Sequence, residues 1–143
     1  MSRNFNPILC TDAYKVGHAE QYPEGTQDVI SNLTARGSRI PDIDHTVFFG
    51  LQSWMMQFLI NDFNEGFFRK DQDSVIREYE RRVTNLLGPD NNVGIQKIRD
   101  LHDLGYLPIT IKALPEGTRV PPRVPMFPIG LTAPDERFSW VAI

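Results

Sequence analysis

The sequence predicts a small α+β domain in which one mixed or antiparallel sheet is flanked by about three helices. Three stretches between residues 51 and 104 carry apolar side chains at helical spacing. Shorter stretches on either side of this helical block alternate apolar and polar residues, as strands do. The length of 143 residues, without internal repeats or low-complexity tracts, indicates a single domain over residues 1–143.

The helical block contains three apolar stripes, each of which predicts one helix. The first covers residues 51–59 and is continuous along one face. The second covers residues 75–87, with Asp73 as the expected N-cap and Gly88-Pro89 as the stop signal. The third covers residues 95–104 and ends before a glycine.

Four stretches predict strands. DVISNLTAR (28–36) alternates, with one face becoming polar toward its end, and HTVFFG (45–50) predicts a second short strand. LPITIKAL (107–114) and VPMFPIGLT (124–132) predict two more, separated by the turn PEGT. Because the last of these contains prolines, we expect it at a sheet edge or beside a bulge.

The two ends of the sequence carry further local signals. Near the start, Thr11 or Asp12 can cap a short helix in which Tyr14 and His18 lie one turn apart. Near the end, Pro134-Asp135 predicts a helix start, and the following residues become apolar. We expect the sequence to be part of a larger protein and to stop within a secondary-structure element. The alternative is a terminal strand that packs into the core.

Composition excludes several classes of function. The net charge of −3 and the scattered arginines and lysines do not suggest a general nucleic-acid or membrane binder, so neither partner is expected. No apolar run approaches the roughly 18 residues that cross a bilayer, and the start resembles no secretory signal. A single cysteine, Cys10, excludes an internal disulfide and fits a reducing compartment, so we expect a cytoplasmic protein in which this side chain is packed and buried.

Most candidate catalytic patterns have simpler structural explanations. His18, His45 and His102 are far apart and lack the spacing of a metal site, so no metal ligand is predicted. No glycine-rich nucleotide loop and no nucleophile elbow occurs. Asp42 and Asp44 lie in a polar stretch and are most simply solvated.

Two clusters remain as candidate binding residues. Asp12, Tyr14, Lys15 and His18 share one short segment, where an aromatic ring beside a carboxylate could orient a flat heteroaromatic ligand. Here the structural alternative is a half-buried Tyr14 and a capping Asp12.

The second cluster is Arg36-Gly37-Ser38-Arg39, which ends the polar strand face. Its two guanidinium groups can hold phosphate through bidentate, charge-assisted hydrogen bonds. Two solvated loop arginines are the alternative interpretation.

Longer motifs around these clusters resemble one family. LCTDAYKVGHAEQYPEGT, NLTARGSR, HTVFFGLQSWMMQFL and DLGYLPITIKALPEGTRVP, in this order, resemble the N-terminal region of nicotinamide phosphoribosyltransferases. The resemblance runs from about residue 8 to residue 134 and is closer to the bacterial and phage branch. It implies the N-terminal domain of a type II phosphoribosyltransferase-like protein that lacks the α/β barrel.

The resemblance also implies an activity. The family forms nicotinamide mononucleotide and pyrophosphate from nicotinamide and phosphoribosyl pyrophosphate in NAD salvage, with Mg²⁺ assisting and ATP hydrolysis coupled. Its members are homodimers with sites at the subunit interface. By resemblance, Tyr14 stacks on the nicotinamide ring with Asp12 beside it, and Arg36 lies near the phosphates. With Arg39, these make the set of candidate substrate-binding residues, and no catalytic residue is predicted.

The departure from the family limits what this chain is expected to do alone. The barrel that supplies most of the phosphoribosyl site is not part of these 143 residues, and the ending FSWVAI differs from the family's helix. We therefore expect this N-terminal portion to be inactive alone and to bind no Mg²⁺ or ATP of its own. Nicotinamide and phosphoribosyl pyrophosphate are expected to bind only in the complete enzyme.

Two alternatives stay open. One is a non-catalytic module that associates with itself or with a full-length relative, through an apolar face that includes Phe138 and Trp140. The other is a small nucleotide or phosphate binder that uses Arg36 and Arg39.

Overall fold

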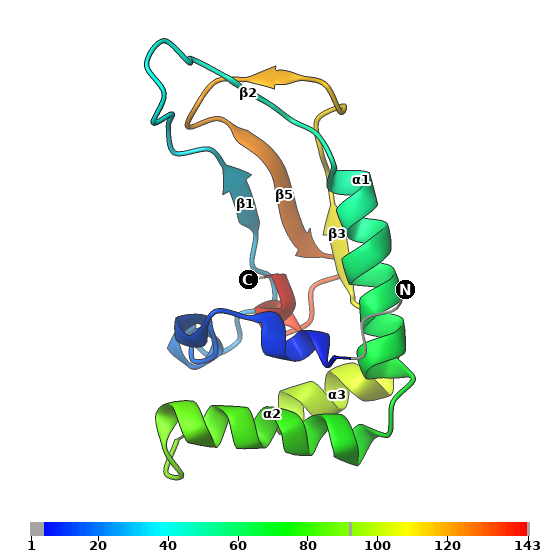
Figure 1. Cartoon of the computed structure of the whole chain (residues 1–143). Coiled ribbons are helices and arrows are strands. Elements are labelled where there is room, and N and C mark those ends of the chain that lie inside the picture. Colours follow the sequence, from blue (N-terminus) through cyan, green and yellow to red (C-terminus); the bar gives the residue numbers. More distant parts are fainter. Residues whose placement is uncertain (1–4, 92, 143) are drawn as a thin grey trace.

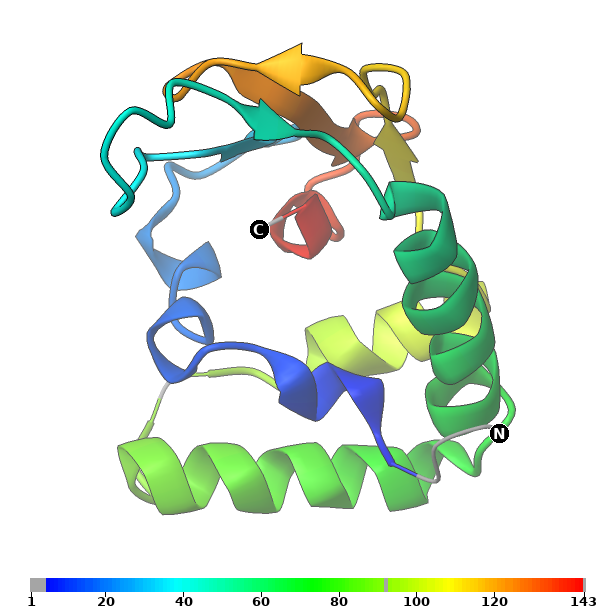
Figure 2. The same ribbon diagram turned by 45° about the horizontal axis from the view of Figure 1, so that its top comes forward.

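The computed structural model describes residues 5–91 and 93–142 and has the expected α+β class. Two small antiparallel sheets lie at one end of the molecule and helices α2 and α3 at the other, with the helical segment that starts at α1 running between them (Figures 1 and 2). None of the helices in the described ranges is long and apolar enough to cross a membrane.

The larger sheet has three antiparallel strands in the order β1-β5-β3. These are β1 (Ser31–Thr34), β5 (Pro125–Leu131) and β3 (Ile109–Ile111). A second sheet pairs β2 (Thr46–Val47) with β4 (Arg119–Val120). The antiparallel arrangement confirms the fold prediction, although β4 was not expected because only two residues pair there.

The proline-containing strand β5 occupies the centre of its sheet, so the expected edge position was wrong. Pro128 pairs with Asn32 on one side, and on the other side its carbonyl accepts a hydrogen bond from the Lys112 N–H at 3.3 Å. In an antiparallel sheet, the N–H and the carbonyl of one residue face the same neighbouring strand. The N–H that Pro128 lacks would therefore face Lys112, which lies just past the end of β3. The alternative expectation was a bulge, and the β1–β5 register does shift between Leu33 and Thr34.

The first predicted helix continues well beyond its apolar stripe. It begins as α1 (Leu51–Trp54) and continues as the π-helical segments η4 (Met55–Asp62) and η5 (Asn64–Phe68). π-Helical winding brings residues five apart into contact, and the Phe58 and Phe63 rings meet edge to face with centroids 5.6 Å apart. The 3.6-residue stripe therefore indicated a helix but not its winding.

Helix α2 (Gln72–Leu87) begins earlier than expected, which changes its N-cap. Asp71 caps the helix, with its Oδ2 accepting a hydrogen bond from the Ser74 N–H at 2.9 Å. Asp73 was the expected cap, but it lies inside the first turn, and its carboxylate accepts instead from Arg99 Nη1 at 3.1 Å. Gly88 ends the helix as predicted.

Helix α3 (Gln96–Leu104) ends at Gly105, whose φ of 81° is the left-handed conformation that closes many helices. Two separate groups of buried apolar side chains hold the fold together. The larger group packs α2, α3, η5 and η1 against the lower end of β5; the smaller group lies within the sheets and includes Leu51. The helical segment that starts at α1 contributes to both.

The N-terminal segment forms short 3₁₀ turns in place of the single short helix that was expected. These are η1 (Pro7–Cys10), η2 (Ala13–Lys15) and η3 (Ala19–Gln21). Asp12 stands at the N-cap position of η2, but its side chain makes no capping hydrogen bond. The segment is attached to α2 by Asn6, whose buried amide donates to the Val75 carbonyl at 3.0 Å.

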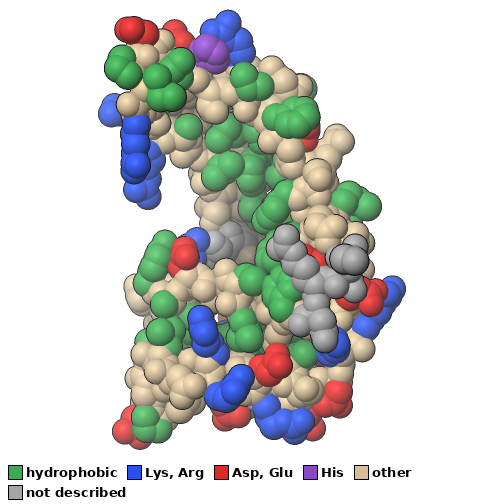
Figure 3. All heavy atoms as spheres, in the orientation of Figure 1, with side chains coloured by type: hydrophobic (Ala, Val, Ile, Leu, Met, Phe, Trp, Pro, Cys, Tyr) green, Lys and Arg blue, Asp and Glu red, His purple; other side chains and the backbone are tan. Residues whose placement is uncertain are grey.

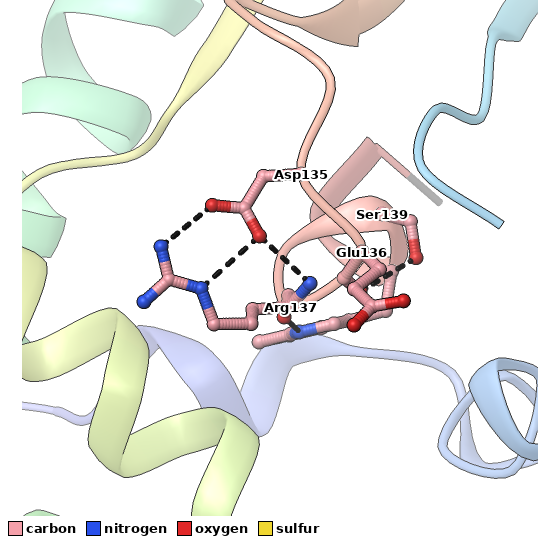
Figure 4. Close-up of polar contacts among 5 residues, drawn as sticks. Asp135, Glu136, Arg137 and Ser139 are labelled. Atoms are coloured by element: carbon pink, nitrogen blue, oxygen red, sulfur yellow. Dashed lines mark hydrogen bonds and ion pairs between the residues drawn. The ribbon is translucent and has the colours of Figure 1, made fainter. Parts of the chain in front are cut away.

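The C-terminal residues form a turn followed by the 3₁₀ helix η6 (Ser139–Ala142), so the expected start at Pro134-Asp135 leads to one short element. Figure 4 shows Asp135 accepting from both the backbone and the side chain of Arg137. The Trp140 indole N–H donates to the Arg137 carbonyl at 2.8 Å. Phe138 is buried in the larger core, so it is not part of an open face. Ile143 lies outside the described residues.

Candidate functional site

An open cavity of about 790 Å³ lies between the N-terminal turns, the sheets and α1. Figure 3 shows a hollow between the sheet end and the helical end of the molecule, with hydrophobic side chains on its wall. Among the described residues, four large apolar side chains both line this cavity and remain considerably exposed: Leu33, Val47, Phe49 and Trp54. Apolar walls with few polar groups suit an aromatic ligand or an apolar polypeptide surface.

Polar groups line the cavity from the N-terminal turns, from β1 and, through Thr46, from β2. Thr11, Asp12 and Lys15 come from the N-terminal turns, and Ser31 and Asn32 come from β1. The Lys15 ammonium lies 3.9 Å from the Asp12 carboxylate, with both side chains partly in solvent. The Asp12 carboxylate therefore lies beside Lys15 at the cavity and does not cap the following turn.

Tyr14 projects into solvent from the same turn as Asp12 and Lys15. It is 67% exposed, and its ring contacts His18 with centroids 5.6 Å apart. The two rings therefore lie together although the expected helix is replaced by 3₁₀ turns, and the half-buried alternative for Tyr14 does not apply. Tyr14 is not among the residues that line the cavity, so a ligand stacked on its ring would lie at the outer surface.

Arg36 and Arg39 lie in the exposed loop between β1 and β2, away from the residues that line the cavity. Between them, the Ser38 hydroxyl makes two hydrogen bonds within the loop. It accepts from the Ile40 N–H and donates to the Ile40 carbonyl, both at 2.9 Å.

A small polar network stands beside this loop. His45 Nδ1 lies 2.6 Å from Asp44 Oδ1 and 2.9 Å from Arg119 Nη2. The hydrogen bond and the charge of His45 lower the pKa of the Asp44 carboxyl. Asp44 is therefore exposed but not simply solvated, because its carboxylate is paired with His45, which also contacts Arg119 of the second sheet.

The three histidines are held apart by separate local contacts. His18 packs against Tyr14, His45 belongs to the polar network, and His102 Nε2 lies 3.0 Å from the Lys70 carbonyl. Nowhere in the described ranges do three or more histidine, cysteine or carboxylate side chains gather in one place.

The exposure of Cys10 differs from the sequence-based expectation. It is exposed and lines the cavity, whereas the sequence suggested a packed and buried side chain. It ends η1, where the chain turns away from the core, while its neighbour Leu9 packs against that core.

Sequence reasoning missed the residues that make most of the apolar wall. Phe49, 80% exposed, lies just beyond a strand of only two residues, and Trp54 belongs to the apolar stripe that predicted the helix over residues 51–59. One signal was available: Phe48 and Phe49 are adjacent, so in an extended segment only one of them can face the core.

The structure is a small α+β domain with an open apolar cavity and an exposed loop that carries two arginines at the sheet end. Residues 6–111 match the family model of the nicotinamide phosphoribosyltransferase N-terminal domain. The chain belongs to this family.

Two curated relatives agree with this assignment. A nicotinamide phosphoribosyltransferase of Acinetobacter baylyi is 46% identical over 99% of this chain, and one of Xanthomonas campestris is 35% identical over 95%. These alignments cover 28% and 26% of the two relatives, so the chain spans about a quarter of their length.

Proposed function

We propose that this chain acts as the N-terminal portion of a nicotinamide phosphoribosyltransferase-like protein, which forms nicotinamide mononucleotide in NAD salvage. The observation that carries this proposal is the 46% identity to the Acinetobacter baylyi relative over nearly the whole chain. The exposed ring of Tyr14 beside Asp12 suits an aromatic amide such as nicotinamide, and the guanidinium groups of Arg36 and Arg39 suit phosphates.

The transfer reaction needs more than these residues provide. Displacement of pyrophosphate at the ribose carbon requires the leaving group and the attacking ring nitrogen to be held in line by preorganised groups. The described part of this chain offers an aromatic surface and arginines, so it would form part of the wall of such a site. Mg²⁺ and ATP, which the family resemblance implies, would be bound by the rest of the complete enzyme.

A chimera tests this proposal directly. Residues 1–134 of this chain replace the matching segment of the Acinetobacter baylyi relative, and nicotinamide mononucleotide formation is measured with nicotinamide, phosphoribosyl pyrophosphate, Mg²⁺ and ATP. We expect product from the chimera, much less from its Tyr14→Ala variant, and none from the 143-residue chain alone. A chimera that folds but forms no product would contradict the proposal, and turnover by the chain alone would contradict its dependence on the remaining polypeptide.

The open cavity favours a second candidate function, a module that associates with a second copy of itself. Phe49 is 80% and Trp54 42% exposed; together they offer on the order of 250 Å² of apolar surface, about a third of what each partner buries in a standard interface. The net charge of −3 is too small to oppose association.

Sedimentation equilibrium at micromolar concentration tests this second function. We expect a dimer that Phe49→Asp dissociates, while Leu87→Asp does not, because Leu87 is similarly apolar and exposed but lies outside the cavity. A monomeric wild type would contradict self-association.

A further inference from the structure

His45 contacts two charged neighbours through a single ring nitrogen. Its Nδ1 lies 2.6 Å from Asp44 Oδ1 and 2.9 Å from Arg119 Nη2. Asp44 precedes His45 in the chain, whereas Arg119 belongs to β4 of the second sheet. Among the described residues, these are the two charged side chains within hydrogen-bonding distance of His45. With 29% of its side chain in solvent, the ring is enclosed between a carboxylate and a guanidinium.

One nitrogen cannot form a hydrogen bond with both neighbours at once. An ionised carboxylate only accepts hydrogen bonds, so Asp44 needs a proton on Nδ1. A guanidinium only donates, so Arg119 needs Nδ1 without a proton. The charged ring carries hydrogen on both nitrogens and also repels the guanidinium. A single proton on Nδ1 therefore selects the partner of His45.

The two contacts have different consequences for the second sheet. The Asp44 contact joins adjacent residues, so it can persist when β2 and β4 separate. The Arg119 contact joins residues that are 74 positions apart, and it requires the two strands to be paired. A proton-free Nδ1 therefore stabilises the paired sheet, and protonation of the ring favours its opening.

The second sheet is short enough for one such contact to matter. Strands β2 and β4 pair over only two residues each, at the end of the molecule far from α2 and α3 (Figure 1). The pairing continues at Phe48, whose N–H donates to the Thr118 carbonyl at 2.9 Å and whose carbonyl accepts from the Gly117 N–H at 2.7 Å. Phe48 and Phe49 both line the cavity, so opening of this sheet would alter the cavity wall.

We propose that His45 is a pH-sensitive switch that holds the second sheet closed through Arg119 when its ring is neutral and releases it when the ring is protonated. Histidine is the side chain that ordinarily changes charge between about pH 5 and 8. Asp44 stays ionised over this range, because the hydrogen bond and the charge of His45 lower the pKa of its carboxyl. The sheet end should therefore loosen as the pH falls from about 8 to about 5.

Amide hydrogen exchange of the 143-residue chain, resolved by residue with NMR at about pH 5.5 and about pH 7.5, tests this switch. Rates are corrected for the intrinsic exchange rate at each pH, and α2 serves as the reference for changes of the whole fold. We expect the amide protons of β2, β4 and Phe48 to be about tenfold less protected at the lower pH, relative to those of α2. This factor corresponds to the loss of one hydrogen bond to a charged group.

Substitutions of the two partners separate the switch from other effects of pH. His45→Gln keeps an acceptor for Arg119 but cannot be protonated, so its second sheet should be equally protected at both pH values. Arg119→Met keeps an apolar stem but has no donor, so its sheet should show the lower protection at both. Arg81→Met removes an exposed arginine of α2 and should keep the pH dependence of the wild type. Unchanged protection of α2 shows that each variant is folded.

The position of the ring hydrogen gives a second readout, which long-range ¹H–¹⁵N correlation spectra measure. At about pH 8, the neutral ring of His45 should carry its hydrogen on Nε2 and leave Nδ1 free to accept from Arg119. In Arg119→Met, the hydrogen should move to Nδ1, where it bonds to Asp44. A merely structural role of Arg119 would not change this tautomer.

Three results would overturn the inference: a neutral wild-type His45 with its hydrogen on Nδ1, a second sheet whose relative protection is the same at both pH values, or a pH dependence that persists in His45→Gln. These measurements need no substrate, so they are independent of the proposed function. An inactive chimera would refute the proposed enzyme and leave the switch, whereas any of the three results would refute the switch alone.

Discussion

Gly66 is the position where a single methyl group should disturb the attachment of the N-terminal turns. It lies buried in η5, and a Cβ placed there would stand 2.2 Å from the Phe5 carbonyl oxygen and 2.9 Å from Pro7 Cδ. Such distances are far inside van der Waals contact, so Gly66→Ala forces either the helix or the N-terminal segment to move.

The size of the effect follows from what is lost if the N-terminal segment detaches. Ile8 is buried, which is worth about 2 kcal/mol, and the Asn6–Val75 hydrogen bond contributes about 1 kcal/mol. Against this loss, alanine in a helix is favoured over glycine by about 1 kcal/mol. We therefore expect Gly66→Ala to lower the free energy of unfolding by about 2 kcal/mol, or Tm by about 4–8 °C for a chain of this size.

Urea denaturation followed by circular dichroism measures this change, and Gly17→Ala serves as the control. Gly17 has nothing within 4 Å of an added Cβ and no positive φ, so its variant should be as stable as the wild type or slightly more stable. If Gly66→Ala were also as stable as the wild type, the close passage of Phe5 over the helix would not exist and the reasoning would fail.

Three further predictions concern single side chains. Tyr14→Ala should lower the free energy of unfolding by less than about 1 kcal/mol, against roughly 3–5 kcal/mol for a buried aromatic, because the ring is 67% exposed; a midpoint shift of core size in urea would contradict this. Asp71→Ala should cost about 1 kcal/mol through loss of the α2 cap, and Asp73→Ala, which removes only an exposed ion pair, about 0.5 kcal/mol or less in the same assay. The hydrogen bonds from Arg137 lower the pKa of Asp135, so the unfolded chain takes up the proton first and stability falls as pH drops below about 5. Unfolding midpoints from pH 6 to pH 3 should therefore fall less steeply in Arg137→Gln than in the wild type; parallel curves would exclude this contribution.

The helices were predictable because their signals are local. The stripe over residues 75–87 and the Gly88-Pro89 stop depend on neighbours within a few turns, and the structure places α2 there. The N-cap was misplaced by two residues because Asp71 and Asp73 are chemically identical candidates, and only the true helix start distinguishes them. The π-helical winding after Trp54 could not be predicted, since it depends on how several phenylalanine rings pack around Phe63.

The sheet and the cavity were less predictable because they depend on contacts between distant segments. Nothing near Pro128 in the sequence shows that β3 ends at Ile111, one residue before the position that would face an N–H of residue 128. Likewise, Cys10 and Phe49 face the cavity because of how separate elements assemble. The exposed character of Tyr14 and the arginine loop agreed better with expectation, since both follow from short polar segments that offer little to bury.

The division of the interior into two apolar groups predicts two units that open separately. We expect the smaller unit, built around Phe48, Val120 and Phe127, to open while the helical base stays closed, because the two groups share no buried side chain. The amide protons of β2 and β4 should then exchange with solvent through local opening, at a lower free energy than those of α2. A ligand that binds only the sheet end would then stabilise that unit selectively and slow its exchange without changing that of α2.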